Sequence, residues 1–294
     1  MDNRNQGAIK TIIYSDIFDF PLTKDEIWKF LIGKKINRKT FKRELGSLVN
    51  SKARPLGSDR KLYYLLGREE IVEKRIKRKK ESRKKLDFAK KIIKFISYIP
   101  TIKLIGISGA LALRNSDKED DIDLFVITSK NTLWITRLLL VFLLILMRQY
   151  RGRGKKESQK ICLNMLIDEE ALMFEKIRQN LYTAHEIVQL KPMFERDNIY
   201  NKFLSANKWI DTFLPNGRIM NRESGIMERR KDPLFIIHNL LLILEKFAKF
   251  FQLLYMRGHR TRETISDHML AFHPYEYKNH VLKEYNKRLS KYEI

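Results

Sequence analysis

The sequence contains one cysteine and few long apolar runs. Cys162 has no partner for a disulfide within the chain, which excludes the disulfide-stabilised class of small secreted proteins and is typical of a reducing compartment. The N-terminal residues MDNRNQGAIK contain no apolar segment of the signal-peptide type. We therefore expect a cytoplasmic protein.

The longest uninterrupted apolar run extends from Leu138 to Met147. It is about half of the roughly 20 residues that a membrane-spanning helix needs, so we expect no transmembrane segment. We interpret this run as a helix buried under a sheet. A second apolar stretch, residues 234–256, is interrupted by polar and charged side chains and predicts an amphipathic or largely buried helix, with attachment to a membrane surface as the alternative.

Acidic residues are scarce relative to basic ones. Lys and Arg total 59 and Asp and Glu total 35, which gives a formal net charge of +24. Such an imbalance concerns partners rather than fold, and polyanions such as nucleic acid or nucleotide phosphates are its natural partners. A hydrophobic content of 44% is ordinary for a globular protein, and 294 residues suffice for two or three compact units.

Residues 1–68 predict a small helical module. Thr23 is a good N-cap, and Glu26 three residues later completes a capping box. Gly33 ends that helix, and Asn37 caps the next one. The expected elements are helices over residues 8–18, 23–32 and 38–50, and a strand over residues 61–66.

This order of three helices and a β-turn resembles a winged helix-turn-helix. In that family the third helix enters the major groove of DNA, so the resemblance implies contacts between this helix and phosphates, with no base assigned. The alternative is a module that packs within the protein or against another protein. The exposed basic positions would be Arg38, Lys39, Lys42 and Arg43.

Residues 69–98 predict one long helix that connects the module to the next domain. The segment from Lys77 to Lys85 has seven basic residues, one acid and no apolar side chain. We expect that this middle part buries no face and forms a solvated connector. The alternative is a stripe that binds nucleic acid or another polyanion.

Residues 99–215 predict an α/β domain, because apolar strands alternate with helices. Residues 181–215 are interpreted as a helical extension, and residues 216–294 as a C-terminal helical region. The expected strands are residues 103–107, 121–128 and 160–168, and the expected helices are residues 110–113, 131–150 and 169–178.

Two features of this domain indicate chemistry. Ser108, Gly109 and Ala110 form a small-residue turn after the first strand, where a backbone or a phosphate can come close. Asp121 and Asp123 begin the second strand and, being two residues apart, share a face. Their carboxylates repel each other unless a cation lies between them. Together these parts predict a Mg²⁺-dependent nucleotide site, although a loop and a solvated strand start would give a similar pattern.

This pattern resembles the nucleotidyltransferase superfamily that includes DNA polymerase β. Its signature is a hydrophobic residue, Gly and Gly/Ser, a spacer, and Asp-hydrophobic-Asp/Glu-hydrophobic. Here Gly109-Ala110 matches the first pair, and Asp121-Ile122-Asp123-Leu124 matches the acidic motif. The resemblance implies an NTP substrate, Mg²⁺ or Mn²⁺, and transfer of a nucleoside monophosphate to an unidentified acceptor. Ala110 lacks the hydroxyl that normally touches phosphate, and whether Ser108 replaces it is open.

In this family a third carboxylate comes from a later strand. The corresponding strand here, residues 160–168, has Asn164 at that position, and an amide oxygen can ligate Mg²⁺ but cannot act as a base. Asp168 lies roughly 13 Å further along the strand and could substitute only in another register. We therefore predict metal ligation by Asp121, Asp123 and Asn164. A non-catalytic nucleotide-binding regulator coupled to a DNA-contacting winged helix is the alternative to an enzyme.

Two further features have more than one interpretation. The loop that contains Arg148, Arg151, Arg153, Lys155 and Lys156 either meets phosphates or is a solvated connection. His185 is a lone histidine in an expected helix, for which a packing role is favoured over a ligand role.

Overall fold

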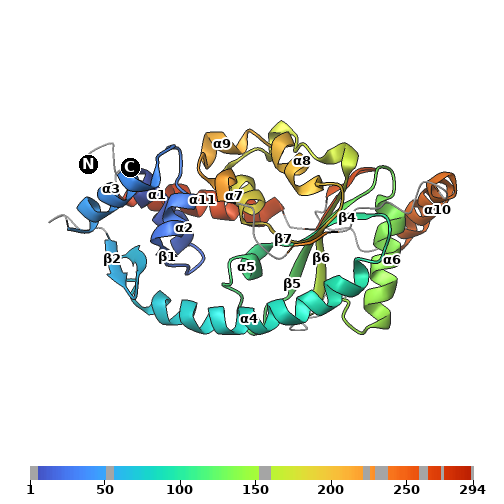
Figure 1. The fold of residues 1–294 in the computed structure, drawn as a ribbon, viewed down its shortest axis with the longest axis horizontal. Helices are drawn as coiled ribbons and strands as arrows, with labels where there is room; N and C mark the ends of the chain where they lie inside the picture. The colour runs from blue at the N-terminus through green and yellow to red at the C-terminus, as the bar shows by residue number, and fades with distance from the viewer. Residues whose placement is uncertain are drawn as a thin grey trace.

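The computed structural model describes residues 6–50, 56–151, 160–220, 226–228, 238–257, 264–272 and 275–292. Within these residues a seven-stranded mixed sheet has helices on both faces, and a small three-stranded sheet belongs to an N-terminal module at the opposite end of the molecule (Figure 1). The protein therefore has a mixed α/β fold, as expected from the alternation of apolar strands and helices.

The N-terminal module combines three helices with the three-stranded sheet. Its elements are α1 (Gln6–Asp16), β1 (Leu22–Thr23), α2 (Lys24–Lys29), α3 (Arg38–Asn50), β2 (Leu56–Asp59) and β3 (Leu62–Leu65), with strand order β1-β3-β2. The capping box of Thr23 and Glu26 is present. α2 ends three residues earlier than expected, because Phe30 and Leu31 leave the helix and are buried in the core.

α3 is amphipathic, as expected. The side chain of Asn37 accepts a hydrogen bond from the backbone N–H of Thr40 at 2.9 Å and so caps the helix. One side of α3 faces the core of the module, and the opposite side faces solvent. The buried residues include Phe41, Leu45 and Leu48, and the exposed basic residues are Arg38, Lys39, Lys42 and Arg43.

α4 (Glu70–Ile96) runs from the N-terminal module to the seven-stranded sheet (Figure 1). The expectation that its basic middle buries no face is wrong, because Ser82 and Lys85 are buried. The ammonium group of Lys85 donates hydrogen bonds to the Ser116 hydroxyl and to the carbonyl oxygens of Asp117 and Asp120. A buried charge is tolerated where its hydrogen bonds are satisfied, and the aliphatic stem of lysine packs as an apolar group. The absence of apolar residues in a segment therefore does not exclude that some of its side chains are buried.

The centre of the large sheet follows the expected alternation. Its elements are β4 (Ile102–Ile107), α5 (Gly109–Ala112), β5 (Ile122–Thr128), α6 (Leu133–Leu146) and β6 (Ile161–Asp168). β4 and β5 are antiparallel neighbours, whereas β5 and β6 are parallel and are joined through α6. Such a crossover is what a parallel pair requires, because its two strands run in the same direction.

The part of the chain after β6 departs from the expectations. Instead of a helix over residues 169–178 there are two short 3₁₀ turns, and strands appear where only helices were expected. The elements are η1 (Glu169–Ala171), η2 (Lys176–Arg178), α7 (Leu181–Gln189), β7 (Lys191–Glu195), α8 (Ile199–Ala206), α9 (Ile210–Phe213), η3 (Gly217–Met220), β8 (Met227–Glu228), α10 (His238–Arg257), β9 (Thr264–Ile265), β10 (Met269–Ala271) and α11 (Tyr275–Lys291). The sheet order is β8-β7-β4-β5-β6-β10-β9. The expectation that everything after residue 215 is helical is therefore wrong.

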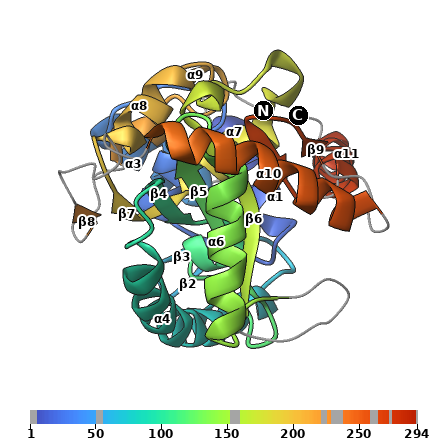
Figure 2. The ribbon, with the colours of Figure 1, turned by 90° about the vertical axis from the view of Figure 1, so that its right-hand side faces the viewer.

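The two faces of the sheet are covered by different helices. Phe125 and Ile127 of β5 belong to a core that also contains residues of α7, α8 and the N-terminal module. The alternate residues, Leu124 and Val126, belong to a second core with residues of α4 and α6. Figure 2 shows α6 lying across this second face. Both faces of the sheet are therefore buried.

α6 is buried on one side only. Leu140 and Leu144 are fully buried, so the interpretation of a helix packed on a sheet holds for its inner side. Its outer side is exposed over Leu138, Phe142 and Leu146. Of the helices in the described residues, none is long and apolar enough to cross a membrane.

Candidate functional site

The small-residue turn follows β4 and lies against β5. Ile107, the last residue of β4, pairs with Leu124, so the chain that leaves β4 passes directly over the start of β5. Ser108 is extended, and its backbone N–H donates to the carbonyl oxygen of Asp123 at 2.9 Å. Gly109 has a φ of +64°, a left-handed conformation that favours glycine. The turn is therefore fixed both by the left-handed backbone of Gly109 and by the hydrogen bond from Ser108 to β5.

Asp123 is the acid that touches this turn. A Cβ atom built on Gly109 would lie 2.9 Å from Oδ2 of Asp123, closer than such atoms approach in proteins. Any other residue at this position would require the carboxylate to move. Asp123 also lies opposite Cys162 of β6, and burial, followed by the negative charge of Asp123, raises the pKa of that thiol to about 12.

Asp121 lies immediately before β5, next to Asp123. Its Oδ2 pairs with the guanidinium of Arg151, and its Oδ1 is buried without a hydrogen-bond partner in the described part of the chain. Burial raises the pKa of Asp121, Arg151 opposes that change, and the charge of Asp123 adds to it. The two acids are therefore close enough to repel each other, as expected for this pair.

Two cations offset the charge of the acids. Arg151 pairs directly with Asp121, whereas Lys85 lies beneath the loop of residues 115–120 that leads to it. Burial lowers the pKa of Lys85, and the negative charges of Asp120 and Asp121 oppose that change. Of the other basic residues expected in the loop after α6, Arg148 is exposed, and Arg153, Lys155 and Lys156 lie outside the described residues.

Asn164 lies beside the turn rather than opposite the acids. Between Leu163 and Met165 the pairing with β5 shifts by one residue, so Asn164 is the extra residue of a β-bulge. Its side-chain N–H donates to the Ser108 hydroxyl at 3.1 Å, and the residue is buried. Asn164 therefore holds β6 against the turn. Ala110 is exposed and brings no polar side chain.

Asp168, the acid of β6, does not join the pair. Asp168 is opposite Thr128 at the far end of β5, where its carboxylate accepts hydrogen bonds from the backbone N–H groups of Asn131 and Glu170. The alternative register that would bring Asp168 to the acids is excluded. The residue opposite Asp123 is Cys162. Its place beside the acids has no signal in the sequence, where a single cysteine indicates only a reducing compartment.

The oxygen atoms present suit a hard divalent cation. Among the described residues no group of three or more His, Cys, Asp or Glu side chains could hold a metal ion. Mg²⁺, however, is commonly bound by one or two carboxylates, with water and substrate phosphate as the remaining ligands. Oδ1 of Asp121, which has no hydrogen-bond partner in the described residues, and the carboxylate of Asp123 are compatible with that mode, since both are oxygen ligands and the two groups are close enough to interact electrostatically.

Comparisons with protein-family models, with curated proteins and with solved structures found no match to this chain. The resemblance to nucleotidyltransferases consequently depends on the residues described above.

Proposed function

We propose that this protein binds a nucleoside triphosphate with Mg²⁺ or Mn²⁺ at Asp121 and Asp123 and transfers a nucleoside monophosphate to an acceptor. The observation that carries the proposal is the contact between Asp123 and Gly109. A carboxylate that can hold a cation thus stands against a turn that a phosphate group can approach. This juxtaposition is what the nucleotidyltransferase motif requires.

The arrangement of the strands supports this proposal. Ser108 and Asp123 are 15 positions apart in the sequence, and the antiparallel pairing of β4 and β5 brings them into hydrogen-bond contact. The turn and the acids are thereby held by a sheet that is covered on both faces. A rigid sheet positions polar groups more accurately than a loop does.

In the proposed reaction an acceptor oxygen attacks the α-phosphorus of the NTP, and pyrophosphate leaves. A bound divalent cation would supply charge neutralisation and orientation for the phosphates. Asp121 and Asp123 would hold that cation, and the backbone around Gly109 would lie beside the phosphate oxygens. Arg151 would exchange its contact with Asp121 for a contact with phosphate.

One observation favours a second candidate, a nucleotide-binding regulator without catalytic activity. Cys162 and Asn164 occupy the part of β6 that faces the acids and the turn, and neither brings a carboxylate. A half-buried thiol whose pKa is about 12 does not serve as a base at neutral pH. The acceptor would then lose its proton to water or to the substrate, or would not react.

The two candidates are distinguished by incubating the protein with Mg²⁺ or Mn²⁺ and each labelled NTP. Pyrophosphate release or self-labelling that disappears in Asp121→Ala/Asp123→Ala supports the transferase. The matched control is Glu119→Gln, an exposed acid two residues before Asp121. Nucleotide binding that needs both aspartates, without turnover, supports the regulator. Activity that survives the double substitution rejects the proposed site.

We also propose that the N-terminal module is a winged helix that contacts DNA through α3. The order of three helices and the β1-β3-β2 sheet supports the resemblance, and the exposed side of α3 is basic. Neutral substitutions of Lys39, Lys42 and Arg43 should weaken DNA binding and reduce its dependence on salt. The control is the neutral substitution of three exposed lysines of α4, Lys90, Lys91 and Lys94. Binding that ignores ionic strength contradicts the proposal.

A further inference from the structure

Two polar side chains fix the orientation of α10 on the sheet. The carboxylate of Glu245 accepts hydrogen bonds from the backbone N–H groups of Trp134 and Ile135, both at 2.7 Å, at the beginning of α6. One side-chain N–H of Gln252 donates to the Trp134 carbonyl oxygen at 2.8 Å. Glu245 and Gln252 are buried and lie two helical turns apart on the same side of α10. The opposite side of α10 must therefore face outward.

That outward side is apolar and aromatic. Phe247 and Phe250 are 59% and 62% exposed, and the outer side of α6 adds further large apolar side chains. Figure 2 shows α10 crossing α6 on the same side of the molecule. More than half of the large apolar side chains that are exposed in the described residues come from these two helices. They are Leu138, Phe142, Ile145 and Leu146 of α6, and Ile243, Leu244, Phe247, Phe250, Phe251, Leu254 and Tyr255 of α10.

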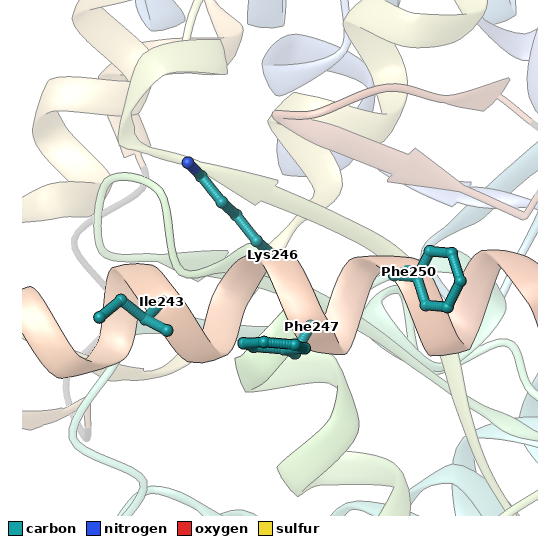
Figure 3. Close-up of a pocket in the computed structure, with 4 residues that line it drawn as sticks. All are labelled: Ile243, Lys246, Phe247 and Phe250. Atoms are coloured by element: carbon teal, nitrogen blue, oxygen red, sulfur yellow. The ribbon is translucent and has the colours of Figure 1, made fainter.

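We call these residues the α6–α10 face. Monomeric proteins rarely leave apolar patches of this kind in water unless the patch binds something. A shallow hollow of about 390 Å³ lies on it, lined by Ile243, Lys246, Phe247 and Phe250. Figure 3 shows the Lys246 side chain extending away from the helix, beside the apolar residues.

The charge of the face is of one sign. α6 contains no acidic residue, and the acid of α10, Glu245, is turned inward and bonded to the backbone of α6. Lys246 is exposed and has no ion-pair partner among the described residues, whereas Lys249 pairs with Asp267 at the edge. The surface thus combines exposed phenylalanines with an ammonium group that no described acid neutralises, and neither helix has an outward carboxylate.

We propose that the α6–α10 face docks on an anionic lipid surface. Phe and Leu side chains enter the boundary between headgroups and acyl chains, and the ammonium of Lys246 extends along its apolar stem to the phosphates. Neither helix crosses the bilayer, in keeping with their lengths and charges. The protein as a whole carries a formal charge of +24, which adds a long-range attraction to such a membrane.

A second copy of the chain fits this face less well. In a two-fold interface both copies use the same surface, so Lys246 would meet a surface without outward acids on α6 or α10. The like charges would oppose association, whereas anionic headgroups complement them. The face lies on the side of the sheet opposite to Phe125, so lipid docking leaves the candidate site, on the Phe125 side, uncovered.

The test uses the full chain and sedimentation with phosphatidylcholine vesicles that contain or lack phosphatidylglycerol. We expect binding to the anionic vesicles, and a loss of at least about tenfold in partitioning for Phe247→Glu/Phe250→Glu. Lys246→Gln should reduce binding to the anionic vesicles more than to the neutral ones. The matched control is Met173→Glu/Ile177→Glu, which places two acids at exposed apolar positions outside the face.

Circular dichroism and thermal unfolding establish that each variant is folded before its binding is compared. Equal vesicle binding by the wild type and by Phe247→Glu/Phe250→Glu overturns the proposal, as does an absence of binding by the wild type. Light scattering on the same samples tests whether a second copy of the chain, rather than lipid, occupies the face. A dimer that the double substitution dissociates, without vesicle binding, identifies a second copy of the chain and also overturns lipid docking.

Discussion

Asp123 lies so close to Gly109 that one added methyl group would stand 2.9 Å from its Oδ2 atom. Gly109 also has a φ of +64°. The residue is thus constrained twice, by its own backbone and by the carboxylate that it accommodates. The most direct tests of the site begin with this pair.

Gly109→Ala should impair the site more than the fold. The left-handed conformation costs a non-glycine residue about 1–2 kcal/mol, and the new methyl group must displace the Asp123 carboxylate. We expect nucleotide affinity, measured by calorimetry with Mg²⁺ present, to fall at least about tenfold. The control is Gly46→Ala on α3, where no atom lies within 4 Å of the added methyl. That change should stabilise the protein by about 0.5–1 kcal/mol, and equal affinities of the two variants would contradict the proposed site.

Lys85→Met should destabilise the loop that leads to the acids. The buried ammonium bonds to Ser116, Asp117 and Asp120. Its loss leaves the Asp120 carbonyl oxygen without this donor, whereas the Asp117 carbonyl oxygen still accepts from the Ser116 hydroxyl and the Asp120 N–H. The free energy of unfolding, measured by chemical denaturation, should fall by about 1–3 kcal/mol. Lys84→Met changes the neighbouring lysine, whose side chain is 66% exposed, and should have little effect. Similar losses for both variants would mean that Lys85 contributes only charge.

The elements that the sequence predicted are those with local signals. Thr23 with Glu26, and Asn37 with Thr40, specify helix starts within four residues. By contrast, β10 has three residues and pairs with β6, so that Leu270 lies opposite Leu166. A strand that short has no measurable period, and its stability comes from a partner about a hundred positions away. Nothing local distinguishes it from a loop.

The candidate site shows the same division. The contact between Asp123 and Gly109 followed from a strand, a turn and a second strand that are consecutive in the chain. The place of Asn164 did not, because Cys162 pairs with Asp123 and a bulge after Leu163 leaves Asn164 without a partner position on β5. A strict two-residue period puts residues 162 and 164 on one face but cannot say which of them is opposite the acid. The register of a parallel pair is a tertiary property.

Asp16→Asn should loosen the attachment of the C-terminal helix. Asp16 is buried at the end of α1, where it binds Arg68 at 2.9 Å and also Arg288 of α11. Asparagine keeps one acceptor oxygen but carries no charge, so it cannot bind both guanidinium groups as the carboxylate does. Arg68 still pairs with Asp19 and Arg288 with Glu284, so the free energy of unfolding should fall by about 1–3 kcal/mol. Asp25→Asn is the control, because Asp25 is 64% exposed in its pair with Arg38. Hydrogen exchange of α11 that is unchanged in Asp16→Asn would argue against this attachment.

His185 should make the protein less stable in acid. It is buried, stacks on Tyr14 with ring centroids 4.0 Å apart, and its Nε2 has no hydrogen-bond partner in the described residues. Burial lowers the pKa of His185 from 6.5 to about 3. Between these values the unfolded chain binds a proton that the folded chain excludes, so stability falls as the pH falls, by about 1.4 kcal/mol per pH unit.

His185→Phe removes this proton while keeping a ring against Tyr14. We expect the difference in unfolding free energy between the variant and the wild type to be constant above about pH 6.5 and to shift in favour of the variant below it. Urea denaturation between pH 7 and pH 5 would measure the difference. His280→Gln, at an exposed position of α11, should give no such trend. If the two variants depended on pH in the same way, the packed, neutral imidazole between α1 and α7 would not be the cause of the acid sensitivity.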